Sequence, residues 1–154
     1  MIGPVVLDTN LLLLLVFGTT SKDYIALHKR LATDFTYLHY ELLVEWTGRF
    51  SDIVLVPHIV AETSSLLRHI ANPKRRSIQA TFQKLISSTI EYPVPSAMGA
   101  ARDEFQDLGI TDAVILHLLS LNEMAPTLLT IDQPLSNRAN ALGYCVLDFR
   151  QFMD

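Results

Sequence analysis

Near its start the chain reads Val5-Val6-Leu7-Asp8-Thr9-Asn10, and this stretch decides the fold. A run of apolar residues, mostly β-branched, is typical of a buried strand. The polar residues lead into the apolar run 11–17, which predicts the buried first turns of a helix. In an open α/β sheet, ligands usually bind where such a strand ends. We therefore expect Asp8 either at the mouth of a crevice or as the cap of the next helix, a position that favours Asp and Asn.

Strand-like and helix-like segments alternate about five times along the chain. Further strands are expected at residues 53–56, 90–94, 127–131 and 144–147. Helices are expected at residues 23–33, 37–46, 58–70, 73–88, 96–108, 111–123 and 134–142, with a short one from residue 148. This alternation predicts an α/β fold with a parallel sheet covered by helices on both faces. Pro93 places its strand at an edge of the sheet.

The composition fits one globular domain over residues 1–154. Hydrophobic residues make up 49% of the chain and charged residues 18%, which excludes a disordered chain. The formal charge of −4 does not indicate a nucleic-acid-binding protein. A metal-dependent nuclease, however, gathers acids in its site and needs only a local basic rim.

Two features bear on the compartment. The apolar run 11–17 is far shorter than the roughly 20 residues of a membrane span, so we expect a soluble, cytoplasmic protein that does not enter a membrane. The single cysteine, Cys145, fits a reducing compartment and is expected as a small core residue of the last strand.

Further acidic residues are expected close to the strand ends. Asp132 directly follows a predicted strand, as Asp8 does, and capping the next helix is its alternative role. Asp112 lies in the first turn of an almost wholly apolar helix. There it either stabilises the helix dipole or points into a polar crevice, because an unpaired buried acid is costly. Glu62 lies on the rim of the apolar stripe of its helix, with a solvated surface glutamate as the alternative.

Four carboxylates at one edge of a sheet repel one another unless their charge is compensated. A hard divalent cation provides this compensation, and Mg²⁺ and Mn²⁺ prefer oxygen ligands. Zinc is not expected, because the histidines are scattered and the sequence lacks a Cys/His ligand pattern. The acids therefore predict a Mg²⁺ or Mn²⁺ site.

Taken in order, these motifs resemble the motif set of PIN-domain nucleases, including the toxin-like ribonucleases of that family. They are Val6-Leu7-Asp8-Thr9-Asn10, Val56-Pro57 with Val60-Ala61-Glu62, Gly109-Ile110-Thr111-Asp112-Ala113 and Leu129-Thr130-Ile131-Asp132. The resemblance spans nearly the whole chain. It implies a three-layer sandwich with a five-stranded parallel sheet and a Mg²⁺- or Mn²⁺-dependent ribonuclease, often the toxin of a type II toxin–antitoxin pair. The stretch 18–51 departs from the small toxins in being longer.

The resemblance also implies roles for individual residues. Acids that would bind the metal or orient water match Asp8, Glu62, Asp112 and Asp132. Polar groups that would support these acids match Asn10, Thr111 and Thr130. The implied partners are an RNA substrate, an antitoxin protein and a second copy of the chain.

A bound nucleic acid also requires cations from the protein. The main basic cluster of the sequence surrounds Asn72-Pro73, and a solvated helix start is the alternative interpretation of it. The candidate nucleic-acid contacts are Arg68, Lys74, Arg75, Arg76 and, independently, Arg138.

Two rival functions come from other classes. A phosphatase of the haloacid dehalogenase type also carries an Asp after its first strand, but it requires a second Asp where this chain has Asn10. The other rival is a PIN-like module that binds RNA or a protein without cleaving anything.

Overall fold

The computed structural model describes residues 3–153 and has an α/β fold around a five-stranded, all-parallel sheet. The strands follow the order β3-β2-β1-β4-β5 across the sheet. They are β1 (Val5–Leu7), β2 (Ile53–Leu55), β3 (Ile90–Glu91), β4 (Thr127–Thr130) and β5 (Val146–Asp148). The predicted fold class is confirmed, and β3 lies at an edge as Pro93 indicated.

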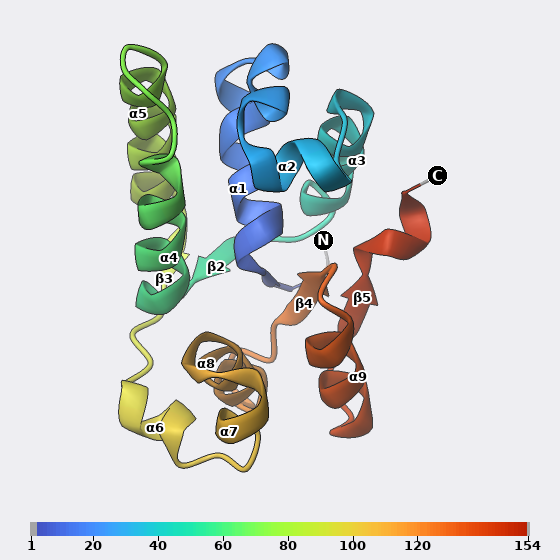
Figure 1. The fold of residues 1–154 in the computed structure, drawn as a ribbon. Coiled ribbons are helices and arrows are strands. Elements are labelled where there is room, and N and C mark those ends of the chain that lie inside the picture. Colours follow the sequence, from blue (N-terminus) through green and yellow to red (C-terminus); the bar gives the residue numbers. More distant parts are fainter. Residues whose placement is uncertain (1–2, 154) are drawn as a thin grey trace.

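Helices cover the two faces of the sheet in two groups, which form the outer layers of a three-layer sandwich (Figure 1). One layer contains α1 (Thr9–Thr20), the 3₁₀ helix η1 (Lys22–Leu27), α2 (Lys29–Asp34), α3 (Tyr37–Thr47), α4 (Pro57–Leu67) and α5 (Lys74–Ser88). The other contains α6 (Ser96–Ala100), α7 (Phe105–Leu108), α8 (Ile110–Leu119) and α9 (Gln133–Ala141). A second 3₁₀ helix, η2 (Phe149–Phe152), follows β5.

The strand β1 lies at the centre of the sheet, between β2 and β4. All of its residues are buried, and Val5 pairs with Ile53 of β2 on one side and with Thr127 of β4 on the other. From β1 the chain moves outward through β2 to β3, and it then returns to place β4 and β5 on the opposite side. The direction of the connections reverses between β1 and β4. In open α/β sheets the carboxyl ends of strands at such a switch point form the ligand crevice.

Helix α1 fills the core next to the sheet. Its apolar run is buried on every side, because α3, α4 and α5 surround it within the layer.

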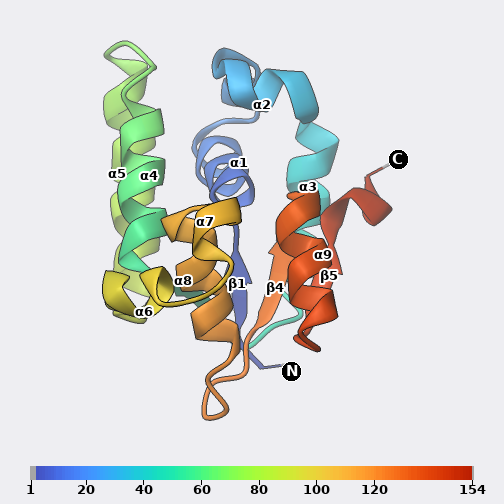
Figure 2. The same cartoon turned by 60° about the horizontal axis from the view of Figure 1, so that its bottom comes forward.

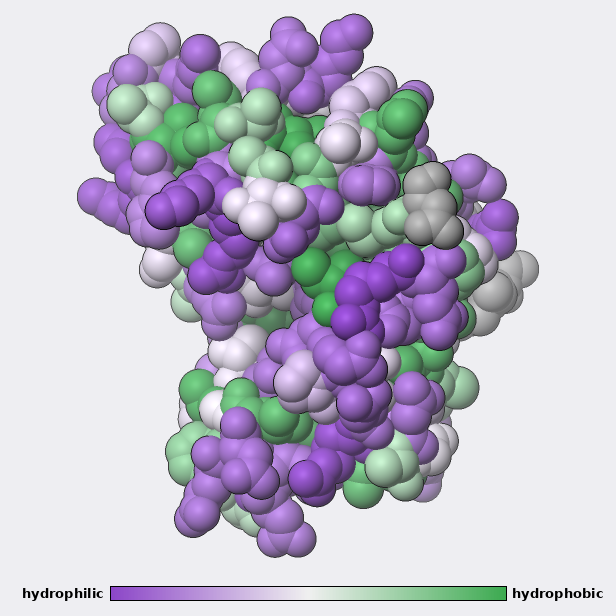
Figure 3. Space-filling model, turned by 45° about the vertical axis from the view of Figure 1, so that its right-hand side comes forward, coloured by the Kyte–Doolittle hydropathy of each residue, from purple (hydrophilic) through white to green (hydrophobic). Residues whose placement is uncertain are grey.

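Within residues 3–153 no helix combines the length and the apolar character that crossing a membrane requires. The outer surface is different: the face shown in Figure 3 is mostly hydrophilic, with separate hydrophobic patches.

Two predicted helices are interrupted in the structure. The helix predicted over 23–33 is broken at His28, which is extended and caps α2 by accepting a hydrogen bond from the Arg30 amide at 3.2 Å. The helix predicted over 96–108 is split into α6 and α7. Between them the chain turns inward to bury Glu104, which pairs with Arg102 at 2.7 Å.

The prediction for Cys145 was wrong. The last strand begins at Val146, two residues later than predicted, and the side chain of Cys145 is exposed. Only the backbone carbonyl of Cys145 takes part in the sheet, accepting a hydrogen bond from the Leu128 amide at 2.9 Å. Because β5 is an edge strand, its flank faces solvent and does not bury this thiol.

Candidate active site

A cavity of about 360 Å³ lies at the switch point, next to the carboxyl ends of β1 and β4. We call it the acidic cavity, because its lining includes Asp8, Glu62, Asp112 and Asp132. These acids come from four separate segments: the end of β1, α4, the first turn of α8 and the end of β4. Figure 2 shows β1 running up to α1, with α7 and α8 on one side of it and α9 on the other. The fold thus brings the four predicted acids to one place.

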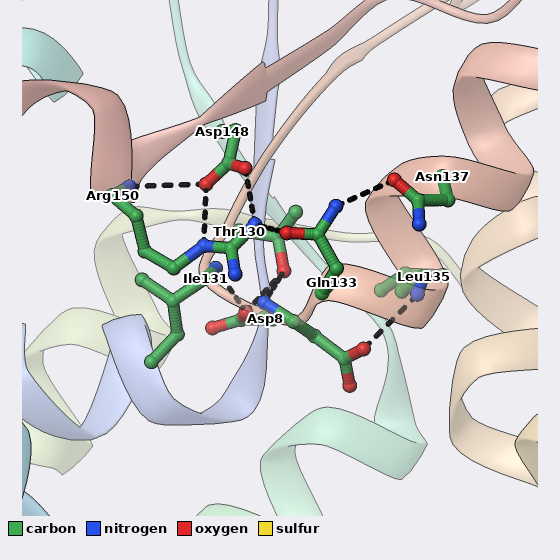
Figure 4. Close-up of polar contacts among 9 residues, drawn as sticks. Asp8, Thr130, Ile131, Gln133, Leu135, Asn137, Asp148 and Arg150 are labelled. Carbon is green, nitrogen blue, oxygen red and sulfur yellow. Dashed lines mark hydrogen bonds and ion pairs between the residues drawn. The ribbon is translucent and has the colours of Figure 1, made fainter.

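Asp8 is buried and its carboxylate is held on both sides. Oδ1 accepts a hydrogen bond from the Leu11 amide at 2.9 Å and thereby caps α1. Oδ2 accepts one from the Ile131 amide at 3.0 Å and another from the hydroxyl of Thr130 (Figure 4). Both predicted roles of Asp8 therefore coexist: it caps a helix and also lines the cavity.

Burial and hydrogen bonding act in opposite directions on Asp8. Desolvation by burial raises its pKa, and the charge of Asp132 adds to the increase. The hydrogen bonds from Thr130, Leu11 and Ile131 favour the ionised form and reduce the increase. The donors therefore hold the carboxylate in place, while its pKa still lies above the ordinary value. A bound cation would favour the ionised form and oppose this increase.

Thr130 joins two of the acids. Its side chain is fully buried, and its hydroxyl donates to Asp8 while accepting from the Asp132 amide at 2.9 Å. Asp132 in turn caps α9, with Oδ1 accepting from the Leu135 amide at 3.0 Å. The predicted supporting role of Thr130 therefore corresponds to a specific hydrogen-bond bridge between the ends of β1 and β4.

Asp112 experiences the charge of the whole group most strongly. It lies in the first turn of α8, where desolvation raises its pKa to about 7, and the charges of Asp132, Asp8 and Glu62 contribute in that order. At neutral pH its carboxyl group is therefore only partly ionised. A group in this state binds either a proton or a cation, which relieves the repulsion within the cavity.

Glu62 is exposed, but it does not point away from the site. It lines the acidic cavity, and its Oε2 accepts a hydrogen bond from the Thr111 hydroxyl of α8 at 3.1 Å. Thr111 was expected to support the acids, and it does so by tying Glu62 of α4 to the first turn of α8. The alternative of a purely solvated glutamate does not describe this contact.

Gly109 sets the direction in which α8 starts. It joins α7 to α8 with φ 85° and ψ 175°, a backbone conformation essentially restricted to glycine. Space is available around it, because a Cβ at this position would meet nothing within 4 Å. The glycine is therefore needed for backbone conformation and not for close packing.

Gly109→Ala is accordingly expected to lower the free energy of unfolding by roughly 1–3 kcal/mol, the cost of the strained backbone. Urea unfolding followed by circular dichroism measures this change. Gly3→Ala is the matched control, since it also has open space around it but lacks a positive φ. Equal stability of the two variants would contradict the backbone explanation.

Two arginines close to the acids, of which only Arg30 lines the acidic cavity, were not anticipated from the sequence. Arg30 of α2 lines the acidic cavity, and its Nη1 donates to Oδ1 of Asn10 at 3.2 Å. Arg150 of η2 donates to Asp148 and Gln133 (Figure 4). Hydrogen bonding to Asp148 raises the pKa of Arg150, and the charge of Asp132 contributes as well. Neither arginine belongs to one of the acidic motifs of the sequence. Both reach the carboxyl edge of the sheet only because of how the chain folds.

The predicted basic residues lie elsewhere. Within the described part of the chain, the cluster Arg68, Lys74, Arg75 and Arg76 does not line the acidic cavity; it surrounds the turn between α4 and α5. Arg138 of α9 pairs with the buried carboxylate of Glu104 at 3.5 Å, where Arg102 pairs as well. Arg138 is therefore part of an ion-pair network that joins α9 to the segment before α7.

The donor chemistry of the acidic cavity fits Mg²⁺ or Mn²⁺. Its walls carry carboxylate, amide and hydroxyl oxygens, the ligands that hard divalent cations prefer. As they stand, however, no three acidic, histidine or cysteine side chains among residues 3–153 are arranged as a ready-made metal site. An ion would have to draw the carboxylates together, and Asp8, Asp112, Glu62 and Asp132 would hold it.

Comparison with known proteins adds no assignment. No protein-family model matches the chain, and no curated protein is significantly similar to it in sequence. The acidic cavity itself is therefore the basis for the proposed function.

Proposed function

We propose that the chain is a Mg²⁺- or Mn²⁺-dependent endoribonuclease that hydrolyses phosphodiester bonds, in keeping with its resemblance to PIN-domain nucleases. The observation that carries the proposal is the convergence of four acids, from four segments, on one cavity at the switch point of the sheet. Structural needs account for two of them, since Asp8 and Asp132 cap helices. Helix capping does not account for Asp112 and Glu62, because the cap position of α8 is Gly109 and Glu62 lies in the middle of α4.

Each acid of the cavity has its own proposed role in holding the cation and supporting the reaction. A bound divalent cation would supply charge stabilisation at the phosphate and a more acidic attacking water. Asp8 is positioned by backbone and hydroxyl donors, so its carboxylate orientation does not depend on the ion. In the metal-free protein, burial and the surrounding acids raise the pKa of Asp112 to about 7, so its carboxyl group would release its remaining proton when it binds the cation. Glu62, held by Thr111, closes the cavity from the side of α4.

Glu62→Gln is the cleanest single test of this proposal. The side chain is exposed, so the substitution is expected to leave folding unchanged while lowering kcat/KM for RNA cleavage in Mn²⁺ roughly 10²–10⁴-fold. Glu41→Gln, an equally exposed change on α3, is the matched control and should cleave at the wild-type rate. Cleavage of a fluorescent oligoribonucleotide at several Mn²⁺ concentrations measures both. Wild-type cleavage by Glu62→Gln would contradict the assignment.

The second candidate, a PIN-like module that binds without cleaving, makes a different prediction for the metal. Isothermal titration of the metal-free protein with Mn²⁺ is expected to give a heat of binding that Asp112→Asn removes. A binding module that needs no ion gives no such heat. The acidic cavity favours the nuclease, because a module that only binds RNA gains nothing from four acids facing a polyanion.

The finer assignments stay predictions of the family resemblance. These are the toxin role, the antitoxin partner and the homodimer. Sedimentation velocity of the purified chain tests the homodimer directly, and growth arrest on expression of the wild-type chain but not of Glu62→Gln tests the toxin role.

A further inference from the structure

We infer that a single strand of RNA leaves the acidic cavity along a track of two further cavities, with Arg30 and His69 at the junctions and Lys74 at the far end. The inference rests on the proposed function for the identity of the ligand as RNA. It adds the path of the strand and the residues that hold the nucleotides beyond the cleaved bond.

The first step of the track is a cavity of about 430 Å³ beside the acidic cavity. We call it the histidine cavity; its lining includes His28, Lys29, Arg30, Leu66 and His69. Arg30 lines both cavities, and its guanidinium donates to Asn10 on the side of the acidic cavity. Among the described residues that line the acidic cavity, Arg30 is the one cation, and it is thus placed to hold the phosphate next to the cleaved one.

The histidine cavity offers an aromatic platform. The rings of His28 and His69 are stacked, with centroids 5.4 Å apart and an interplanar angle of 19°. His28 is buried and fixed: its Nδ1 accepts from the Arg30 amide, so its Nε2 donates to the Leu66 carbonyl at 3.1 Å. Phe17 supports it edge-on at 5.6 Å between centroids. His69 is exposed on top of this rigid ring and presents its imidazole to the cavity.

The second step is a cavity of about 410 Å³ at the turn between α4 and α5, which we call the turn cavity. His69 lines it as well, and Lys74 lines its far side. The Nζ of Lys74 lies 5.8 Å from the centre of the Tyr24 ring, which orders the lysine beside η1. Figure 2 shows this turn at the same end of the molecule as α2, which carries Arg30. The track thus connects the acidic cavity to the basic cluster around the turn.

The alternation of cation, ring and cation matches the chemistry of a single strand. Phosphates bind Arg and Lys, whereas unpaired bases stack on aromatic side chains, histidine included. In a duplex the bases are paired and stacked within the helix, so they are not available to His69. Asp34 also lines the histidine cavity, but Lys29 and Arg30 outnumber it there. We therefore assign the track to single-stranded RNA.

The test measures binding without cleavage. In EDTA, fluorescence anisotropy with a labelled octauridylate gives Kd for each variant at several salt concentrations. Arg30→Gln and Lys74→Gln are each expected to raise Kd about tenfold and to reduce the slope of log Kd against log salt by about 0.7, the loss of one phosphate contact to single-stranded RNA. His69→Ala is expected to raise Kd roughly 5–150-fold with an unchanged slope, and His69→Phe to restore binding.

Matched controls lie away from the track. Arg49→Gln removes an arginine that is paired with Glu45, and Lys84→Gln removes a lysine of α5 that lines neither cavity. Both should bind the octamer as the wild type does. The inference is overturned if His69→Ala and Lys74→Gln bind normally, if the controls weaken binding equally, or if an RNA duplex of the same length competes as well as the single strand.

The outcome is separable from that of the proposed function. Binding in EDTA involves no divalent ion and no cleavage. If the track variants lose binding while the wild type fails to cleave in Mn²⁺, the track stands and the nuclease proposal falls. If Glu62→Gln abolishes cleavage while the track variants bind normally, the nuclease proposal stands and the track falls.

Discussion

Asp112→Asn is expected to abolish Mn²⁺-dependent RNA cleavage and, at the same time, to stabilise the metal-free protein. The loss of cleavage follows from the removal of a carboxylate from the acidic cavity. The gain in stability follows from the pKa of Asp112, which burial and the neighbouring acids raise to about 7 in the folded protein from an ordinary value of 3.8. At neutral pH the wild type loses folding free energy because Asp112 is costly to ionise in the folded state. The asparagine variant has no such charge and does not bear this cost.

The size and the pH dependence of this gain follow from proton linkage. Between pH 4 and pH 7 the folded chain binds the proton of Asp112 more tightly than the unfolded chain, so wild-type stability falls as the pH rises through this range. One pKa unit corresponds to about 1.4 kcal/mol, and screening by solvent reduces the total to about 2 kcal/mol above pH 7. Urea unfolding in EDTA should show almost no difference between wild type and Asp112→Asn at pH 4 and the full difference at pH 8.

Asp107→Asn on the neighbouring helix α7 is the matched control, since Asp107 is exposed and does not line the acidic cavity. It should not stabilise the protein at any pH. A destabilised Asp112→Asn at pH 8 would show that this carboxylate is not held against the repulsion of its neighbours, and the electrostatic description of the cavity would be wrong.

Asp8→Asn is expected to abolish cleavage as well, but with the opposite effect on stability. One end of the asparagine amide is a donor, and it must face either the Ile131 amide or the Leu11 amide, which are donors themselves. A buried donor thereby loses a charged acceptor, which costs roughly 1.5–3 kcal/mol. Removing a buried charge offsets part of this cost, so we expect a net loss of about 2 kcal/mol.

Asp132→Asn provides the comparison for this variant. Asparagine caps helices as well as aspartate does, so its carbonyl can keep the bond from the Leu135 amide and stability should change by less than about 0.5 kcal/mol. Thermal unfolding of the three asparagine variants therefore separates catalysis from folding: all lose cleavage, whereas one gains stability, one loses it and one keeps it. Equal stabilities of Asp8→Asn and wild type would contradict the hydrogen-bond arrangement around Asp8.

Local patterns in the sequence predict much of this fold and the acidic residues of the site. Short apolar strands followed by polar residues indicate the parallel sheet, and its carboxyl edge is where Asp8 and Asp132 lie. The course of the chain between the strands is harder to predict from the sequence. The break at His28 depends on a hydrogen bond to Leu66, 38 residues away, and on a ring stacked against His69. No periodicity of residues 23–33 carries that information.

The cations illustrate the same limit. Clustering in the sequence singles out Lys74 and its neighbours, but these surround the turn beyond α4 and not the acids. Arg30 looks like any solvated arginine of an amphipathic helix, yet the packing of α2 places it on the wall of the acidic cavity. A basic residue near a site can come from any exposed helix, because the sequence around a long side chain does not indicate which part of the fold the side chain reaches.

The hydroxyl of Thr130 has a consequence for how the cavity would close on an ion. It helps to fix the carboxylate of Asp8 before any ligand arrives, and the Leu135 amide holds the carboxylate of Asp132. Glu62 on the opposite wall is exposed and has a single hydrogen bond among the described residues, from Thr111. Ordering a side chain costs conformational entropy, and here that cost falls almost entirely on one wall. The site would thus combine fixed carboxylates at the ends of β1 and β4 with the mobile side chain of Glu62. Its affinity for a cation depends on how far the Glu62 carboxylate must move to reach the ion.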